Sequence, residues 1–142
     1  MQEVPVNIWA VVAAGIASMA IGYAWYAPFL FGKQWQKLMG ITVKDMEKGK
    51  QEMPRLMIIA FIATLVSAYV LRHVTVFSEA FYGMDWVTTG VMSGFWMWLG
   101  FIAPVQLTDW IYGGKKFQLF MINTGYQLAS MLVMGAIVGG WS

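Results

Sequence analysis

The stretch VNIWAVVAAGIASMAIGYAWY, Val6–Tyr26, decides the fold class of this chain. It contains no charged residue and is as long as the roughly 20 apolar residues that a helix needs to cross the hydrocarbon core of a bilayer. We predict a membrane-spanning helix at about residues 6–27. A secretory signal peptide is the alternative, but such a peptide should begin with basic residues, and Met1–Val6 contains only Glu3.

Three more apolar runs follow this stretch. The first lies between Arg55 and Arg72, and the others contain no charged residue at all. We predict the corresponding helices at about residues 54–75, 86–108 and 117–140. A buried helix of a soluble protein would explain one such run, but four runs in 142 residues exceed what a soluble core of this size can hold. The predicted fold class is therefore all-α: a polytopic membrane protein, residues 1–142, with four transmembrane helices in an up-down bundle.

The composition supports this class and excludes others. Hydrophobic residues make up 59% of the chain and charged residues 11%, against about 25% charged residues in an ordinary soluble domain. The net charge of +2 is too small for a nucleic-acid-binding surface, so no nucleic-acid partner is expected. Cysteine is absent, which removes disulfides and thiolate metal sites, while eight tryptophans suit the two water–lipid interfaces.

The second predicted helix has a short apolar core. The 16 residues from Leu56 to Leu71 span roughly 24 Å at 1.5 Å per residue, less than the hydrocarbon thickness of about 30 Å. We therefore expect Arg55 and Arg72 to extend to the lipid headgroups and the helix to stand upright. Pro54 is expected in the first turn of this helix, where its missing N–H costs nothing.

The segment 33–55 is the one long polar stretch. Thr42 and Asp45 have the spacing of a capping box, which predicts a short surface helix over Val43–Met53. Before it, Trp35, Leu38 and Met39 are spaced as on a helix that lies in the membrane interface. A solvated linker is an equally open interpretation of this part.

The distribution of Lys and Arg predicts the orientation. Eight of the nine basic residues lie in loops 33–55 and 109–117, and only Arg72 lies beside the loop between the second and third helices. Basic loops tend to stay in the cytoplasm. We expect both basic loops in the cytoplasm and both termini outside it, in the cell (inner) membrane.

Small residues spaced by four predict how the helices pack. Gly90 and Gly94 in the third helix, and Gly135 and Gly139 in the fourth, form GxxxG patterns, which let two helix backbones approach closely. The contact could lie within one bundle or between chains. A protein of four thin helices has little interior, so a homo-oligomer is expected as well.

The polar residues within the apolar runs are few. Asn123 and Gln127, one turn apart, could hydrogen-bond across helices or bind a polar ligand. Asp109 precedes Lys115 by six residues and is expected to form an interfacial ion pair. His73 stands alone, so no metal or haem site is predicted, and we expect no catalytic residues and no cofactor.

An aromatic motif follows the first helix in the string GYAWYAPFLFGKQW, Gly22–Trp35. Pro28 should end or kink the helix, and Gly32 permits a turn that a side chain would block. The aromatic residues should then gather at the inner interface, as an anchor that sets helix depth or as the wall of a lipid pocket. The binding candidates of the motif are Trp25, Tyr26, Pro28, Phe31, Gly32 and Trp35.

This motif resembles the G-x-x-W-Y-x-P-x-x-F-G-x-x-W signature of small bacterial membrane proteins of the domain-of-unknown-function family numbered 1761. The similarity continues at Gly40-Ile41-Thr42 and at Asn123, Gly125 and Tyr126. The resemblance implies a four-helix membrane protein without an assigned activity. It supports the topology and says nothing about mechanism.

These observations predict a non-enzymatic membrane protein that acts through helix packing, as a homo-oligomer or as a small accessory subunit of a membrane complex. Its expected partners are membrane lipids and other membrane subunits. The alternative is a carrier or channel in which an oligomer lines a path with Asn123, Gln127 and Gln106. A lipid-modifying enzyme that uses Asp109 is the least favoured hypothesis.

Overall fold

In the computed structural model, which describes residues 3–141, every regular element is a helix. In chain order these are α1 (Ile8–Trp25), α2 (Gly32–Met39), α3 (Val43–Tyr82), α4 (Trp86–Met97), the π-helical segment η1 (Trp98–Ile102), α5 (Ala103–Gly113) and α6 (Phe117–Gly140). The segments α4, η1 and α5 follow one another without a break and form the third span. Within the described residues, four helices are long and apolar enough to cross a membrane, so the predicted fold class is confirmed.

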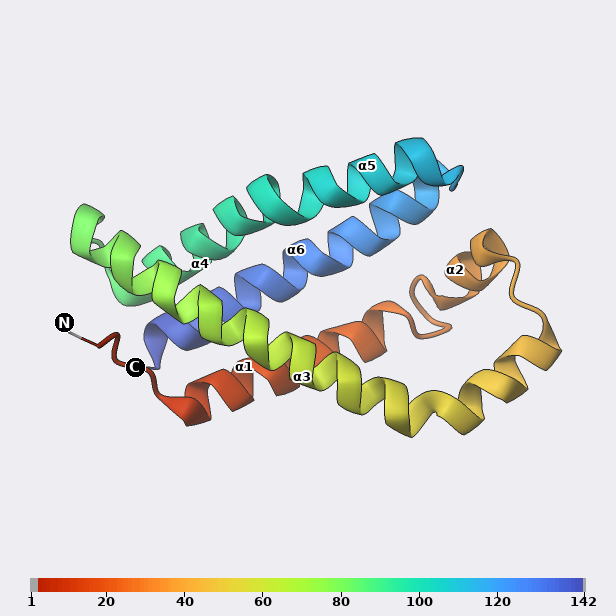
Figure 1. Cartoon of the computed structure of the whole chain (residues 1–142), viewed down its shortest axis with the longest axis horizontal. Helices are drawn as coiled ribbons and strands as arrows, with labels where there is room; N and C mark the ends of the chain where they lie inside the picture. Colours follow the sequence, from red (N-terminus) through yellow and green to blue (C-terminus); the bar gives the residue numbers. More distant parts are fainter. Residues whose placement is uncertain (1–2, 142) are drawn as a thin grey trace.

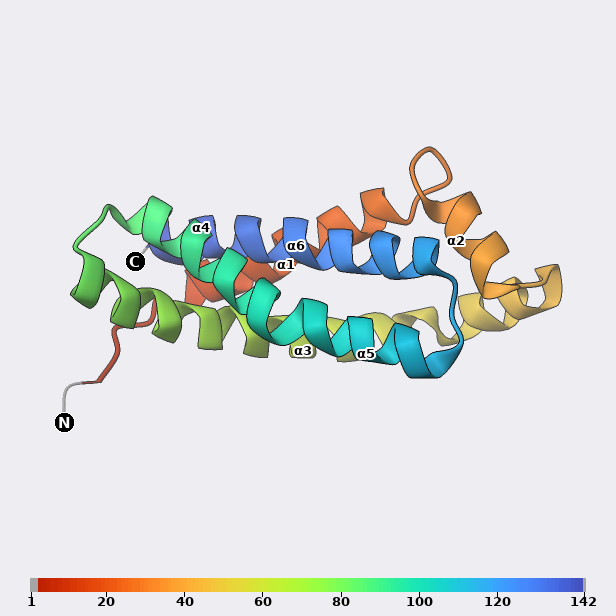
Figure 2. The ribbon, with the colours of Figure 1, turned by 90° about the horizontal axis from the view of Figure 1, so that it is seen from above.

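The four spans run up and down along the long axis of the molecule. Figures 1 and 2 place both termini and the α3–α4 turn at one end, which we call the terminal end. The opposite end holds α2, the beginning of α3 and the α5–α6 turn with Lys115 and Lys116. We call it the basic end. α6 lies in the middle of the bundle and contacts α1, α3 and α4.

The first and third spans differ a little from their predicted ranges. α1 begins at Ile8, two residues late, because the side chain of Asn7 accepts a hydrogen bond from the N–H of Trp9 and caps the helix. It ends at Trp25 rather than residue 27. The third span continues past residue 108 to Gly113, one turn beyond its expected end, whereas α6 coincides with 117–140.

The second span differs most from its predicted bounds. Residues 54–75 are helical, but they belong to one α3 helix of 40 residues that also contains the predicted helix over Val43–Met53. Trp35, Leu38 and Met39 lie on the helix α2, so the segment 33–55 is not one loop. Thr42 and Asp45 do form the expected capping box, and hydrogen bonds from Thr42 hold the pKa of Asp45 below its usual value. However, the helix that this box starts does not stop at Met53. At 1.5 Å per residue α3 is about 60 Å long, twice the hydrocarbon thickness.

Pro54 lies inside α3 instead of in its first turn. Proline cannot donate a hydrogen bond to the carbonyl four residues earlier, here that of Lys50. This part of the helix is exposed along its whole circumference, so water can satisfy that carbonyl. Figure 1 shows α3 bending in its yellow stretch, the part of the chain to which Pro54 belongs. The proline thus bends the helix without ending it.

Arg72 does not extend to the headgroups as expected but is buried, at 3% exposure. Its Nε donates to the carbonyl of Pro5 at 3.0 Å and its Nη1 donates to the carbonyl of Val138 at 3.0 Å. The latter carbonyl is one of the last four of α6, which have no partner within the helix. The guanidinium also lies 4.9 Å from the ring centre of Trp86. The C-terminal dipole of α6 and this ring favour a cation, so Arg72 is stabilised without a carboxylate.

The third and fourth spans meet at their glycines. A Cβ atom at Gly90 would overlap the carbonyl of Gly135, and a Cβ at Gly135 would overlap the carbonyl of Gly90. Gly94 lies in the same way against the backbone of Met131, and Gly139 against that of Trp86. The GxxxG patterns therefore serve packing within one bundle, where the backbones of α4 and α6 touch.

The apolar core is small and lies where α1, α3 and α6 cross. Its buried members are Val11, Ala14, Ala68, Leu71, Met131, Met134 and Val138. Most large apolar side chains of the spans point outward instead. This distribution suits a protein whose surroundings are hydrocarbon rather than water.

Replacing Gly90 by alanine should force α4 and α6 apart. We expect a loss of about 1–3 kcal/mol of stability, the usual cost of overpacking. Thermal unfolding of the purified protein in one detergent measures it. The control is Gly49→Ala in the exposed part of α3, where a Cβ meets nothing within 4 Å and the stability should stay equal or rise. Equal melting temperatures for Gly90→Ala and wild type would refute the close backbone contact.

Candidate functional site

The aromatic motif forms a compact turn between α1 and α2. After α1 ends at Trp25, the chain makes a tight loop through residues 26–31, with Pro28 exposed on its outside. The N–H of Gly32 donates to the carbonyl of Ala27 at 3.0 Å, and a Cβ at Gly32 would overlap the backbone of Tyr26 and Ala27. The helix therefore ends before Pro28, and Gly32 is needed because the chain passes so close to itself.

The turn brings four of the six aromatic residues of the motif together. The ring centres of Trp25 and Phe31 are 5.0 Å apart, and those of Tyr26 and Trp35 are 5.7 Å apart with the rings nearly perpendicular. Tyr126 of α6 adds a second edge-to-face contact, 5.5 Å from Tyr26. Such tilted and edge-to-face pairs are favourable arrangements of aromatic rings. The cluster fixes α2 against α1 and α6.

The polar atoms of this cluster are bonded to α6. Trp25 Nε1 donates to the carbonyl of Ile122 at 2.9 Å, and the Tyr26 hydroxyl donates to Asn123 Oδ1 at 2.7 Å. Gly125 leaves room for the Trp25 ring, since a Cβ there would lie 3.1 Å from the ring edge. An interface anchor would present these groups to water and headgroups. Here they connect the first span to the fourth.

The other polar side chains of the spans are paired in a similar way. The hydroxyls of Ser18 and Ser130 hydrogen-bond between α1 and α6, and the Tyr126 hydroxyl donates to the Ser18 carbonyl at 3.2 Å. These hydroxyls lie in the middle of the two helices and are occluded from lipid. They act as hydrogen-bonded contacts between the first and fourth spans.

A second set joins the third span to α6 around Thr124. The Thr124 hydroxyl donates to Gln106 Oε1, and Trp98 Nε1 donates to the Thr124 carbonyl at 3.0 Å. Gln106 of α5 is therefore engaged with a neighbouring helix. Gln127 is half-buried, and the structure gives its side chain no partner among residues 3–141. Asn123 and Gln127 thus have different surroundings although they lie one turn apart.

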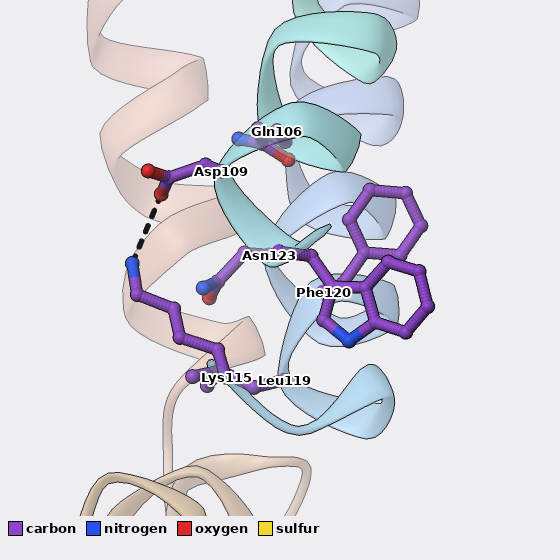
Figure 3. Close-up of a pocket in the computed structure, with 7 residues that line it drawn as sticks. Gln106, Asp109, Lys115, Leu119, Phe120 and Asn123 are labelled. Carbon is purple, nitrogen blue, oxygen red and sulfur yellow. Dashed lines mark hydrogen bonds and ion pairs between the residues drawn. The ribbon is translucent and has the colours of Figure 1, made fainter. Parts of the chain in front are cut away.

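A small polar pocket lies at the basic end, between α5 and the beginning of α6 (Figure 3). Its lining includes Gln106, Asp109, Lys115 and Asn123, and its volume is about 80 Å³. Lys115 Nζ and Asp109 Oδ2 are 3.0 Å apart, so the expected ion pair is confirmed. Both side chains are about half exposed or more, and the pocket has room for only two or three water molecules. A wider and more open hollow of about 420 Å³ shares Gln106 and Asp109 with it.

A more apolar hollow borders the aromatic cluster. Its volume is about 230 Å³, and it is lined by Trp25, Phe31, Gln34, Gln118, Met121 and Ile122. The walls are mostly carbon, with the two glutamines as the polar members. A cavity of this kind fits a lipid chain whose headgroup lies near the amides. Trp25 and Phe31 therefore do both: they belong to the cluster that joins the helices, and they line this hollow.

Sequence reasoning did not find Ser18, Thr124 and Ser130 as bonding partners. Serine and threonine in membrane helices usually bond to a carbonyl of their own helix, so their residue type carries no signal for a contact between helices. No described group of His, Asp or Glu side chains could hold a metal ion.

Comparison with known proteins gives one family. The family model described as "Protein of unknown function (DUF1761)" matches residues 9–139. No curated protein and no solved structure matches the chain.

Removing the Tyr26 hydroxyl tests the connection between α1 and α6. We expect Tyr26→Phe to lower the stability by about 1 kcal/mol, the net value of one hydrogen bond. Chemical unfolding in mixed micelles measures the change. Tyr23→Phe is the matched control, because the Tyr23 side chain is 81% exposed and has no such bond.

A double-mutant cycle with Asn123→Ala completes this test. Because both partners belong to one bond, the Tyr26→Phe change should cost little when Asn123 is already alanine. Additive losses in the double variant, or a Tyr26→Phe loss no larger than that of Tyr23→Phe, would contradict the assignment.

Proposed function

Since this chain belongs to the DUF1761 family, whose description assigns no activity, we propose its function from its geometry: it is a non-enzymatic membrane protein that acts through helix packing. It works as a homo-oligomer or as a small accessory subunit of a membrane complex. Membrane lipids are its other partners.

The pairing of the polar side chains within the spans carries this proposal. Tyr26 with Asn123, Ser18 with Ser130, and Gln106 with Thr124 satisfy one another between helices. A transport path needs such groups on a face that water reaches, whereas packing contacts need them between helices. Their bonding therefore favours packing over the carrier or channel alternative, which would require Asn123 and Gln106 to release their partners.

The exposed carboxylates support the non-enzymatic part of the proposal. Asp45, Asp85 and Asp109 lie at the ends of the helices, in contact with water. Two of them serve as helix caps, and Asp109 is paired with Lys115. Acid–base chemistry needs titratable groups that share a cleft. The three aspartates do not share one with each other, and the titratable group that shares the small polar pocket with Asp109 is Lys115, with which it is paired. The lipid-modifying hypothesis for Asp109 is correspondingly weak.

The half of α3 nearer the basic end is the surface we propose for the partner helix. Its side chains lie outside the bundle from Gln51 to Ala60, although the apolar part of the helix begins at Leu56. Ala60 is exposed there, and the exposed residues Ala63 and Ser67 continue the same shallow surface into the other half of α3. Small residues of this kind allow another helix to approach closely. The charged turns before them would meet the partner's polar part outside the bilayer.

We also propose the orientation and location that the charge distribution favours. The basic end faces the cytoplasm, and both termini lie outside it, in the inner membrane of the cell. α2 and the first turns of α3 then lie at the cytoplasmic headgroups, where their lysines meet anionic lipids.

Crosslinking on this naturally cysteine-free chain tests the proposed contact. Ala60→Cys should give disulfide-linked dimers in native membranes under mild oxidation, since a symmetric contact brings equivalent residues together. The matched control is Val105→Cys, which is exposed on α5 away from this surface and should stay monomeric. In the accessory-subunit form of the proposal, Ala60→Cys is instead trapped by a reactive crosslinker to a different membrane protein.

The result that would overturn the packing role is a monomer at Ala60→Cys in native membranes, with no crosslink to any protein. Equal crosslinking of Val105→Cys would mean random collision and count against the surface in the same way.

Reporter fusions test the orientation. A phosphatase that is active only outside the cytoplasm should be active when fused to the C-terminus and inactive when fused after Gly114, in the basic turn. A fluorescent protein that matures only in the cytoplasm should give the opposite pair. Reversal of both pairs would place the termini in the cytoplasm.

A further inference from the structure

The apolar hollow beside the aromatic cluster lies at the basic end. Its walls come from the aromatic turn, from Gln34 of α2, and from Gln118, Met121 and Ile122 in the first two turns of α6. Figures 1 and 2 show α2 beside this part of α6. The wall can be reached from outside, since Met121 is 57% exposed. The volume of about 230 Å³ is below the roughly 300–1,000 Å³ of sites that enclose a whole small molecule, so the hollow takes up part of a larger one.

The hollow is polar at its mouth and apolar further in. Lys115 and Lys116 directly precede α6, so the first turn of this helix, with Gln118, lies at the headgroups. Gln34 and Gln118 are both exposed there. Ile122 lies about 6 Å further along α6, and the walls at its level are carbon. A molecule that fits this hollow has a polar group at one end and a hydrocarbon part at the other.

The two segments that border the hollow carry only positive charge. Between Glu3 and Asp45 the charged residues are all lysines, and so are those after Asp109. The first group consists of Lys33, Lys37 and Lys44, and the second of Lys115 and Lys116. Lys115 is paired with Asp109, whereas Lys33, Lys37 and Lys116 have no carboxylate partner among residues 3–141. The carboxylates of the first turns of α3 belong to a helix that does not line the hollow. The polar end of the ligand is therefore an anion.

The geometry of α2 gathers donors at the mouth. Lys33 and Lys37 are one helical turn apart, and Gln34 precedes Lys37 by three residues, so these three exposed side chains lie along one side of the helix. On the α6 side, Lys116 precedes Gln118 by two residues. Ammonium groups and amide N–H groups both donate hydrogen bonds, and the oxygens of a phosphate accept them. A phosphate at the mouth would meet donors from both helices.

From these features we propose that the hollow binds an anionic phospholipid of the surrounding bilayer. One acyl chain lies against Trp25, Met121 and Ile122, and the phosphate lies at the mouth, near the two glutamines and Lys33, Lys37 and Lys116. Basic pockets between membrane helices are typical binding sites for such headgroups. A zwitterionic lipid has the same phosphate, but the lysines repel its ammonium group, so the anionic lipid is preferred. The inference names the lipid class within the proposed function and rests on it in one respect, that the basic end lies at the headgroups.

The test uses the full chain, purified in a mild detergent without added lipid, and phosphatidylglycerol as the probe. Native mass spectrometry counts the lipids bound at each lipid concentration. We expect one phosphatidylglycerol to bind at least about tenfold more tightly than phosphatidylcholine with the same acyl chains, because each lysine near an anionic headgroup contributes about fivefold. A melting-temperature rise with phosphatidylglycerol gives an independent readout, since a ligand that binds the folded state stabilises it. This rise should shrink in high salt, which screens exposed charges.

Two sets of lysine substitutions separate the site from the general charge of the basic end. The triple variant Lys33→Gln, Lys37→Gln and Lys116→Gln should bind phosphatidylglycerol no better than phosphatidylcholine. The matched control is Lys44→Gln, Lys48→Gln and Lys50→Gln, which removes the same charge from exposed positions of α3 outside the hollow and should keep the preference. Met121→Trp narrows the hollow itself and should weaken the binding of both lipids.

Three results would overturn the proposal. These are equal affinities of the wild type for the two lipids, an equal loss in both lysine triples, and unchanged binding in Met121→Trp. Lipid-free melting temperatures equal to that of the wild type show that the substitutions leave the fold intact. The outcome is distinguishable from that of the Ala60→Cys crosslinking. A chain that prefers phosphatidylglycerol but stays monomeric loses only the packing role, and one that crosslinks without this preference loses only the lipid site.

Discussion

Where α4 crosses α6, no side chain separates the two backbones, because Gly90 lies on Gly135 and their neighbours one turn away are Gly94 and Gly139. Lipid tails are as apolar as leucine, so burial of apolar side chains contributes little to the association of membrane helices. Close packing of the backbones therefore has to supply the favourable free energy. α6 is the central helix of the bundle, and its position is set by this contact. The hydrogen bonds that join α1, α5 and Arg72 to α6 depend on this position of α6.

Those hydrogen bonds follow one physical rule. In a bilayer a polar group has no water to bond to, so each must find a partner in the protein. Tyr26 hydrogen-bonds with Asn123, and Ser18 hydrogen-bonds with Ser130. Arg72 donates to two backbone carbonyls and lies over the ring of Trp86. It thereby connects the N-terminal segment, the beginning of α4 and the end of α6. Ser93 and Gln127 are exceptions, since the structure gives their side chains no partner among the described residues.

The two ends of the molecule differ in structure. At the terminal end, α3, α4 and α6 are held close by Arg72 and the glycines. Toward the basic end α3 separates from the bundle and continues as an exposed, charged helix, bent at Pro54. The packing role that we propose would need both a rigid part and a surface that the protein's own helices leave uncovered. α3 provides the second through its length.

The sequence by itself determined the number of spans, the capping box at Thr42, the turn at Pro28 and Gly32, the glycine patterns and the ion pair of Asp109 with Lys115. Each of these depends on residues close together in the chain or on composition, which local physics controls. Only the tertiary structure decided that Arg72 is buried, that α3 continues through Pro54, and which polar residues pair. An arginine beside an apolar run normally extends to water. Arg72 does not, because a free helix end and an aromatic ring from distant parts of the chain surround it, and the spacing of residues along the sequence does not predict that these groups come together.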